Sequence, residues 1–201
     1  MELTPAILSS EIRRWFSTTI FPADGIDFTD QNLFRKILDL FSTDYSRYYD
    51  AHPVLQNILI RSELQGIILY RLARELFLKG NEACDDVAVL GRFLSGYEIY
   101  YSAEIGEGLK INHGIGTVIG ARVVIGKQVT LHHGITLGDK NAGRPTLGDH
   151  IIIYPNSIII GNIRIGDHSK IAAGAIVIHD VPGHTTVAGN PARIISNKKN
   201  K

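Results

Sequence analysis

The sequence predicts an α+β repeat protein, with a helical subdomain over residues 1–96 and a parallel β-solenoid of hexapeptide repeats over residues 97–195. Residues 196–201 are expected to form a tail. In the C-terminal half a bulky aliphatic residue returns every six positions, whereas in the N-terminal half apolar residues recur at three and four. The change of period falls at residues 95–98, which marks the domain boundary.

The aliphatic residues of the C-terminal half act as anchors of a repeating coil. A helix would repeat its apolar face at three and four and a strand at two, so a spacing of six fits neither. It fits short extended runs joined by corners, with each anchor pointing into one continuous core. The anchors are Ile99, Ile105 and Ile111, then Ile119, Ile125, Leu131 and Leu137, then Leu147, Ile153, Ile159, Ile165, Ile171 and Val177.

Two breaks in the period indicate where function lies. Two extra residues fall between Ile111 and Ile119, and a polar excursion from Gly138 to Thr146 replaces one short corner. Excursions from a coil cost little free energy, and binding and catalytic residues concentrate on such loops.

Four helical patterns fill the N-terminal half. They are expected over residues 4–20, from a cap at Thr29 through residue 41, from residue 53 to near Gly80, and from residue 87 to Gly96. After the coil, Asp180 to His184 predicts an exit turn, and residues 185–195 are expected to fold back along the solenoid. The N-terminal half is therefore expected to pack as one helical unit.

Composition excludes several classes of function. The 201 residues are 44% hydrophobic with a formal net charge of +1, which favours a globular protein over a nucleic-acid binder. The single cysteine, Cys84, cannot form an internal disulfide, which suits a reducing compartment. We see neither a secretory signal nor an apolar run that would span a bilayer, so the expected location is the cytoplasm, with no membrane partner.

Three motifs resemble those of the hexapeptide-repeat acyltransferase superfamily, and the first two resemble in particular those of its serine O-acetyltransferases. They are residues 111–120, INHGIGTVIG; residues 129–138, VTLHHGITLG; and the closing run of residues 180–193, DVPGHTTVAGNPAR. The resemblance implies a left-handed parallel β-helix that assembles as a homotrimer, whose helical halves can pair two trimers into a hexamer. It also implies acetyl-CoA as co-substrate in a groove between coils, with direct transfer of acetyl to an acceptor hydroxyl.

The same resemblance identifies two catalytic candidates. His113 matches the family's catalytic histidine, and Glu98 stands where the family has an orienting aspartate. The chemistry agrees, since an imidazole with an ordinary pKa of about 6.5 suits a base that activates an alcohol near neutral pH. A carboxylate on the far ring nitrogen would fix the tautomer and stabilise the cation.

Further site residues follow from the resemblance and from departures from it. Asn112 replaces an aspartate that helps to hold the substrate ammonium group, and Arg144 stands near the position of a histidine that contacts serine. Asp50 is the nearest match to a second acidic contact. These departures favour a carboxylate or phosphate at Arg144. Acetyl-CoA is expected to contact three further positions: Gly138, Pro155 and Ala173.

Two alternatives remain beside this interpretation, and a third is rejected. The first is the same transfer onto a sugar or nucleotide-sugar hydroxyl in surface polysaccharide synthesis. The second is a non-enzymatic solenoid scaffold or binding module. The third, a zinc enzyme on the same fold, needs three imidazoles, whereas only His179 and His184 lie five apart and Pro182 interrupts them. No metal is therefore expected.

Overall fold

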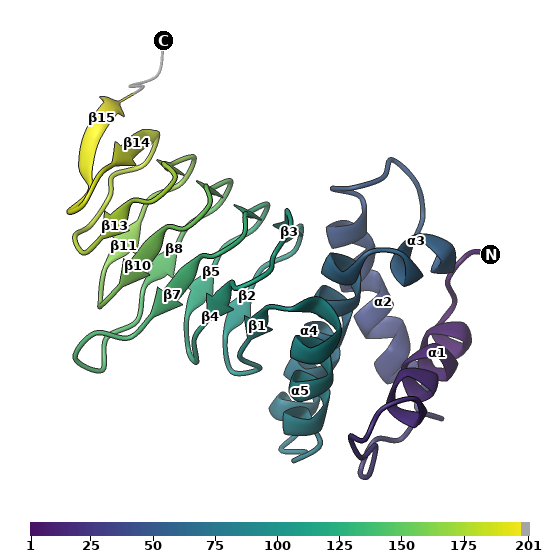
Figure 1. The fold of residues 1–201 in the computed structure, drawn as a ribbon. Helices are drawn as coiled ribbons and strands as arrows, with labels where there is room; N and C mark the ends of the chain where they lie inside the picture. Colours follow the sequence, from purple (N-terminus) through teal and green to yellow (C-terminus); the bar gives the residue numbers. More distant parts are fainter. Residues whose placement is uncertain (198–201) are drawn as a thin grey trace.

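The computed structural model describes residues 1–197, in which a helical half is followed by a solenoid that extends away from it (Figure 1). The predicted fold class, helices first and a parallel repeat second, is confirmed. The helices are α1 Pro5–Ser17, α2 Gln31–Tyr45, α3 Leu55–Leu59, α4 Ser62–Leu78 and α5 Cys84–Ser95.

Two details of the predicted helices are wrong. The third pattern is two helices, because Arg61 is extended between α3 and α4, with φ −124° and ψ 104°. The cap of α2 is Asp30 and not Thr29, because one Asp30 carboxylate oxygen accepts the amides of Asn32 and Leu33 at 3.1 and 3.0 Å. Gly96 ends α5 as predicted, with the left-handed φ of 73° that glycine adopts without cost.

The solenoid consists of short strands in three sheets. The first sheet has the order β1-β4-β7-β10-β13, the second β11-β8-β5-β2, and the third β15-β14-β12-β9-β6-β3. The strands are β1 Glu98–Ile99, β2 Glu104–Ile105, β3 Lys110–Ile111, β4 Val118–Ile119, β5 Val124–Ile125, β6 Thr130–Leu131, β7 Thr136–Gly138, β8 Thr146–Leu147, β9 Ile152–Ile153, β10 Ile158–Ile160, β11 Arg164–Ile165, β12 Lys170–Ile171, β13 Ile176–Val177, β14 Thr185–Ala188 and β15 Arg193–Asn197.

Every predicted anchor is buried, and successive coils stack their anchors in register. Ile111 lies beside Leu131, Leu131 beside Ile153, and Ile153 beside Ile171. Burying one such side chain contributes about 1.5–3 kcal/mol, so the six-residue spacing supplies the core of the solenoid.

The far end of the solenoid closes with a hairpin. Strand β15 pairs antiparallel with β14 and runs to Asn197, two residues into the segment expected to be a tail. The rest of that segment, residues 198–201, lies outside the described residues. Among the helices of residues 1–197, none combines the length and the apolar character needed to cross a membrane.

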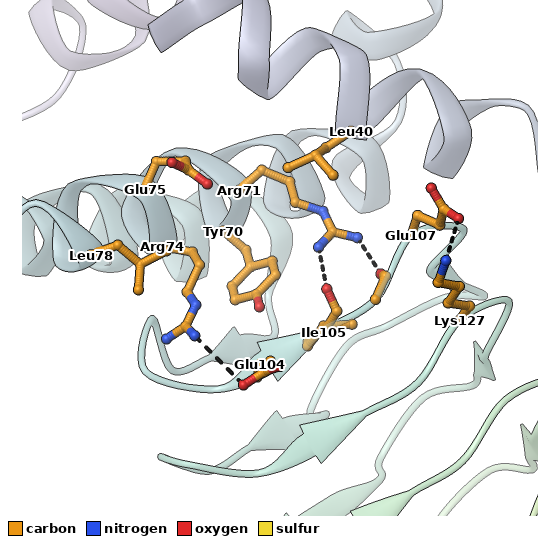
Figure 2. A pocket seen from close by; sticks show the side chains of 11 residues that line it. Leu40, Tyr70, Arg71, Arg74, Glu75, Leu78, Glu104, Ile105, Glu107 and Lys127 are labelled. Carbon is orange, nitrogen blue, oxygen red and sulfur yellow. Dashed lines mark hydrogen bonds and ion pairs between the residues drawn. The ribbon is translucent and has the colours of Figure 1, made fainter.

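The helical half covers the open edge of the first coil with polar side chains. Arg71 on α4 donates to the carbonyl oxygens of Ile105 and Gly106 at 2.6 and 2.7 Å (Figure 2). The same guanidinium binds the buried Asp44 carboxylate through two bonds of 2.9 Å. Asp44 in turn accepts the amide of Leu109 at 2.7 Å. Backbone groups that another coil would satisfy are thus satisfied by α2 and α4.

Candidate active site

His113 lies in the corner between β3 and β4, which is longer than the matching corner of the next coil. Ile111 pairs with Leu131 before the corner, and Val118 pairs with Thr136 after it. The first corner therefore holds residues 112–117, whereas the second holds only residues 132–135. The extra residues are those that the sequence spacing predicted, and they place an exposed His113 side chain on this edge.

The backbone of this corner presents the imidazole outward. His113 has φ 53°, a left-handed conformation that costs free energy in a residue with a side chain. A Cβ on the next residue, Gly114, would lie 2.6 Å from Cδ1 of Tyr97. Tyr97 is buried, and its hydroxyl donates to the carbonyl of Glu63 at 2.7 Å. The Tyr97 ring thus fills the inside of the corner and leaves no room for a Cβ atom at position 114.

Other imidazoles gather near this corner. His132 stacks on Tyr154 of the following coil, with ring centroids 5.3 Å apart. Burial lowers the pKa of His132, and the nearby His133 and His113 lower it further. A lowered pKa keeps His132 neutral near pH 7, so it adds no positive charge beside His113.

Glu98 lies on the strand that neighbours the end of the His113 corner. It pairs with Val118, and the amide of Gly116 donates to the carbonyl of Gly96 at 2.9 Å. The Glu98 carboxylate is half-buried, and its Oε2 lies 3.5 Å from Nη1 of Arg92 on α5. It also lines a cavity of about 160 Å³ with Tyr100 and Tyr101. Its ion-pair partner is thus an arginine that the sequence did not suggest.

Two predicted acceptor residues lie near β3, one directly after the strand and one in the loop that packs against it. Asn112 follows β3 directly, and its amide donates to the carbonyl of Leu131 at 2.8 Å. Asp50 is exposed in the loop between α2 and α3, where it lines an open cavity of about 570 Å³ with Ser42, Ser46 and His52. This loop is held to β3, because the hydroxyl of Tyr48 donates to the carbonyl of Ile111 at 2.7 Å.

Arg144 lies at a different corner, between the first and second sheets. Its Nε donates to the carbonyl of Ala121 at 2.9 Å, and its Nη1 forms an ion pair with Asp139. The guanidinium is therefore folded back within its own excursion, with its side chain 19% exposed. An anionic acceptor would have to displace Asp139 before it could bind the Arg144 guanidinium through two parallel hydrogen bonds.

The three predicted acetyl-CoA residues are divided between the same two corners. Pro155 and Ala173 lie two residues past the anchors Ile153 and Ile171, the position that His113 occupies in the first coil. Gly138 ends β7 and opens the excursion that contains Arg144. The structure thus groups His113, Pro155 and Ala173 along one edge and places Gly138 with Arg144 on another.

The cavity between α4 and the first coil, drawn in Figure 2, is not the candidate site. It measures about 300 Å³ and none of the predicted site residues lines it. Its three carboxylates are already paired: Glu107 with Lys127 at 3.0 Å, Glu104 with Arg74 at 4.0 Å and Glu75 with Lys36 at 2.7 Å. Within residues 1–197, His, Cys, Asp and Glu side chains form no group of three or more that could hold a metal ion.

Sequence reasoning missed two residues that contact the predicted site, Tyr48 and Arg92. Both are placed by the packing of helices against the coil, and neither lies in a repeat motif. A tyrosine just after an amphipathic helix and an arginine on a helix surface carry no signal of their own. The contacts follow only from the folded arrangement.

Comparison with known proteins agrees with this geometry. Residues 144–179 match the family model described as bacterial transferase hexapeptide (six repeats). A serine acetyltransferase of Bacillus subtilis is 35% identical over 167 residues, covering 81% of this chain and 77% of the relative. One of Helicobacter pylori is 36% identical over 169 residues, covering 80% and 98%.

Solved structures extend the likeness over the helical half. The crystal structure of Neisseria gonorrhoeae serine acetyltransferase has a TM-score of 0.82 at 26% identity and covers 100% of this chain and 82% of its own. A serine acetyltransferase in complex with CoA has a TM-score of 0.80 at 25% identity, covering 97% and 86%. The resemblance predicted from the three motifs is confirmed: this chain belongs to the serine acetyltransferase family and is an acyltransferase.

Proposed function

We propose that the protein transfers the acetyl group of acetyl-CoA directly to the hydroxyl of L-serine, with His113 as general base. The observation that carries the proposal is the exposed imidazole of His113 on the lengthened corner, on the same edge as Pro155 and Ala173. Membership of the serine acetyltransferase family supports serine as the acceptor and acetyl-CoA as the donor.

The chemistry needs one proton carrier. The imidazole of His113 takes the proton of the serine hydroxyl while the oxygen attacks the thioester carbonyl. Collapse of the tetrahedral intermediate breaks the carbon–sulfur bond, and the imidazolium returns its proton to the CoA thiolate. The acetyl group ends on oxygen and the histidine is again neutral, so no covalent enzyme intermediate is required.

Glu98 is proposed to orient the base. Its strand runs beside the end of the His113 corner, and one of its carboxylate oxygens is engaged by Arg92. A carboxylate on the far ring nitrogen would hold the tautomer that accepts a proton and would stabilise the imidazolium. Glu98→Gln keeps the shape of the side chain and removes the charge, so it should lower kcat with little effect on the KM for acetyl-CoA.

The acceptor is proposed to lie between Asn112 and the Asp50 loop. The Asp50 carboxylate can bind the ammonium group of the serine substrate, and the side-chain amide of Asn112 can donate to the carboxylate of the same substrate. The ion pair of Arg144 with Asp139 supports serine over an anionic sugar acceptor, because this cation is already neutralised within its own loop.

A homotrimer is proposed to complete the site. In one chain Gly138 and Arg144 lie at the opposite end of the first-sheet strands from His113, so a neighbouring subunit could bring its excursion to this edge. Val118 and Ile115, 39% and 72% exposed, offer apolar surface there. Light scattering should give the mass of three subunits, or of six if the helical halves also pair; a monomer that remains active would contradict this proposal.

The decisive experiment compares acceptors and a matched pair of variants. Glycine suits the left-handed backbone at both His113 (φ 53°) and His150 (φ 56°), so His113→Gly and His150→Gly should both fold. Turnover of L-serine should exceed that of a panel of sugars and should fall by roughly 10²-fold or more in His113→Gly only. Preference for a sugar, or equal activity of the two variants, would refute the proposal.

A further inference from the structure

Three side chains at the C-terminal end of α2 form hydrogen bonds to the backbone of β3 and of the residues just before it. Asp44, Arg47 and Tyr48 lie at the end of α2 and just after it, spaced three and four residues apart, so that they share one face. Asp44 accepts the amide of Leu109 at 2.7 Å, and Nη1 of Arg47 donates to the carbonyl of Gly108 at 2.7 Å.

Tyr48 makes the contact nearest to the base. Its hydroxyl donates to the carbonyl of Ile111 at 2.7 Å and accepts the amide of the same residue at 2.7 Å. Burial raises the pKa of the Tyr48 hydroxyl, which therefore stays protonated and able to donate. Both backbone groups of Ile111 are thus satisfied by one side chain, two residues before His113.

This arrangement replaces a missing coil. On the inner side of β3, the amides of Lys110 and Asn112 donate to Val129 and Leu131 of the next coil at 2.9 and 2.8 Å. The groups of Ile111 face the other way, where the solenoid has no preceding coil. Tyr48 supplies the donor and the acceptor that such a coil would have provided.

We infer that Tyr48 is a positioning residue for His113, fixing the outer edge of β3 and with it the corner that carries the imidazole. The inference rests on the proposed role of His113 as base. His113 itself is exposed on a strained backbone, so its direction depends on how firmly the flanking residues are held. A shift of about 1 Å at a reacting group can cost 10²-fold in rate.

The fold offers a matched control. The hydroxyl of Tyr70 on α4 donates to the carbonyl of Ala103 at 2.9 Å, also at the outer edge of the first coil. Tyr70 is buried, and Ala103 lies in the corner of residues 100–103 between β1 and β2, a corner that contains neither His113 nor Glu98. Tyr70→Phe thus removes one donated hydroxyl bond to the first coil away from His113, whereas Tyr48→Phe removes a donated bond of the same kind near His113 together with the bond accepted from the Ile111 amide.

The test measures steady-state acetyl transfer to L-serine by both variants. We expect Tyr48→Phe to lower kcat roughly tenfold, with the KM for acetyl-CoA within about twofold, and Tyr70→Phe to keep kcat. Hydrogen exchange gives a second readout independent of activity: the Ile111 amide should exchange faster in Tyr48→Phe only. Equal kcat in the two variants, or an unchanged Ile111 exchange rate, would overturn the inference.

A double-mutant cycle separates positioning from a general loss of structure. If Tyr48 acts through His113, Tyr48→Phe should have no further effect on the residual turnover of His113→Gly. A full tenfold effect in that background would show that Tyr48 acts by another route and would overturn the inference. Failure of the base assignment itself is recognised separately, because His113→Gly alone would then retain the turnover of the unmodified protein.

Discussion

The buried ion pair between Asp44 and Arg71 should dominate the stability of the junction between the two halves. The two side chains are 0% and 4% exposed and share two bonds of 2.9 Å. Asp44→Ala removes the carboxylate and leaves the guanidinium buried with only the carbonyls of Ile105 and Gly106. Removing one partner of a buried ion pair lowers the free energy of unfolding by about 3–5 kcal/mol, because the remaining charge is left uncompensated.

The orphaned amide of Leu109 adds to this loss, since a buried donor without a partner costs about 1–3 kcal/mol. The two contributions overlap, and we take about 4 kcal/mol as the expected total. For a chain of this size each kcal/mol lowers Tm by about 2–4 °C, so the expected fall is about 8–16 °C.

Thermal unfolding at fixed protein concentration measures this loss, because the proposed assembly would make Tm depend on concentration. The control is Glu107→Ala, which breaks the exposed pair with Lys127 and should cost under about 1 kcal/mol. The double variant Asp44→Ala, Arg71→Met should recover part of the loss by removing the unpaired charge. A change in Tm of less than about 3 °C for Asp44→Ala would refute the reasoning.

Three further predictions concern the corner and the donor site. Folding lowers the pKa of His132 below its ordinary value of about 6.5, so the unfolded state binds more protons than the folded state. The free energy of unfolding should therefore fall as the pH drops below about 6.5. In thermal melts, His132→Phe should make Tm depend less on pH in this range. Gly114→Ala places a Cβ 2.6 Å from Tyr97 and should cost roughly 1–3 kcal/mol by denaturant unfolding, with loss of turnover. Gly138→Ala meets only ordinary contacts, 3.5 Å from Thr136 and 3.6 Å from Ile160, so it should keep its Tm while raising the KM for acetyl-CoA.

Each of these has a distinct contrary result. An unchanged pH slope in His132→Phe would show that another group titrates. Full stability in Gly114→Ala would mean that the Tyr97 ring can move aside. An unchanged KM in Gly138→Ala would remove that position from the proposed acetyl-CoA contacts, whereas a large fall in Tm would assign it a purely structural role.

The repeat could be predicted from sequence because its physics is local. An anchor such as Ile153 must point inward whichever coil it joins, so a spacing of six defines strand, corner and core together. The two residues inserted before Ile119 likewise predicted a longer corner at His113. The Gly96 cap was predictable because a left-handed helix end favours glycine.

The features that the sequence did not predict depend on contacts between segments that lie far apart in the chain. The break between α3 and α4 carries no proline or glycine, and it is set at Arg61, whose Nε donates to Tyr49 at 2.7 Å. Phe93 continues the apolar pattern of α5 yet is 64% exposed, because the core lies on the other side of that helix. The contact of Arg92 with Glu98 joins a helix to the coil across the domain boundary.

Chemical rescue tests the central claim, that His113 carries the proton in acetyl transfer, most directly. His113→Gly leaves space beside a backbone that glycine adopts freely, so added imidazole can occupy the place of the lost ring. Imidazole should then restore part of the serine acetylation rate, in proportion to its neutral form, while His150→Gly needs none. Undiminished turnover by His113→Gly without imidazole would contradict the account.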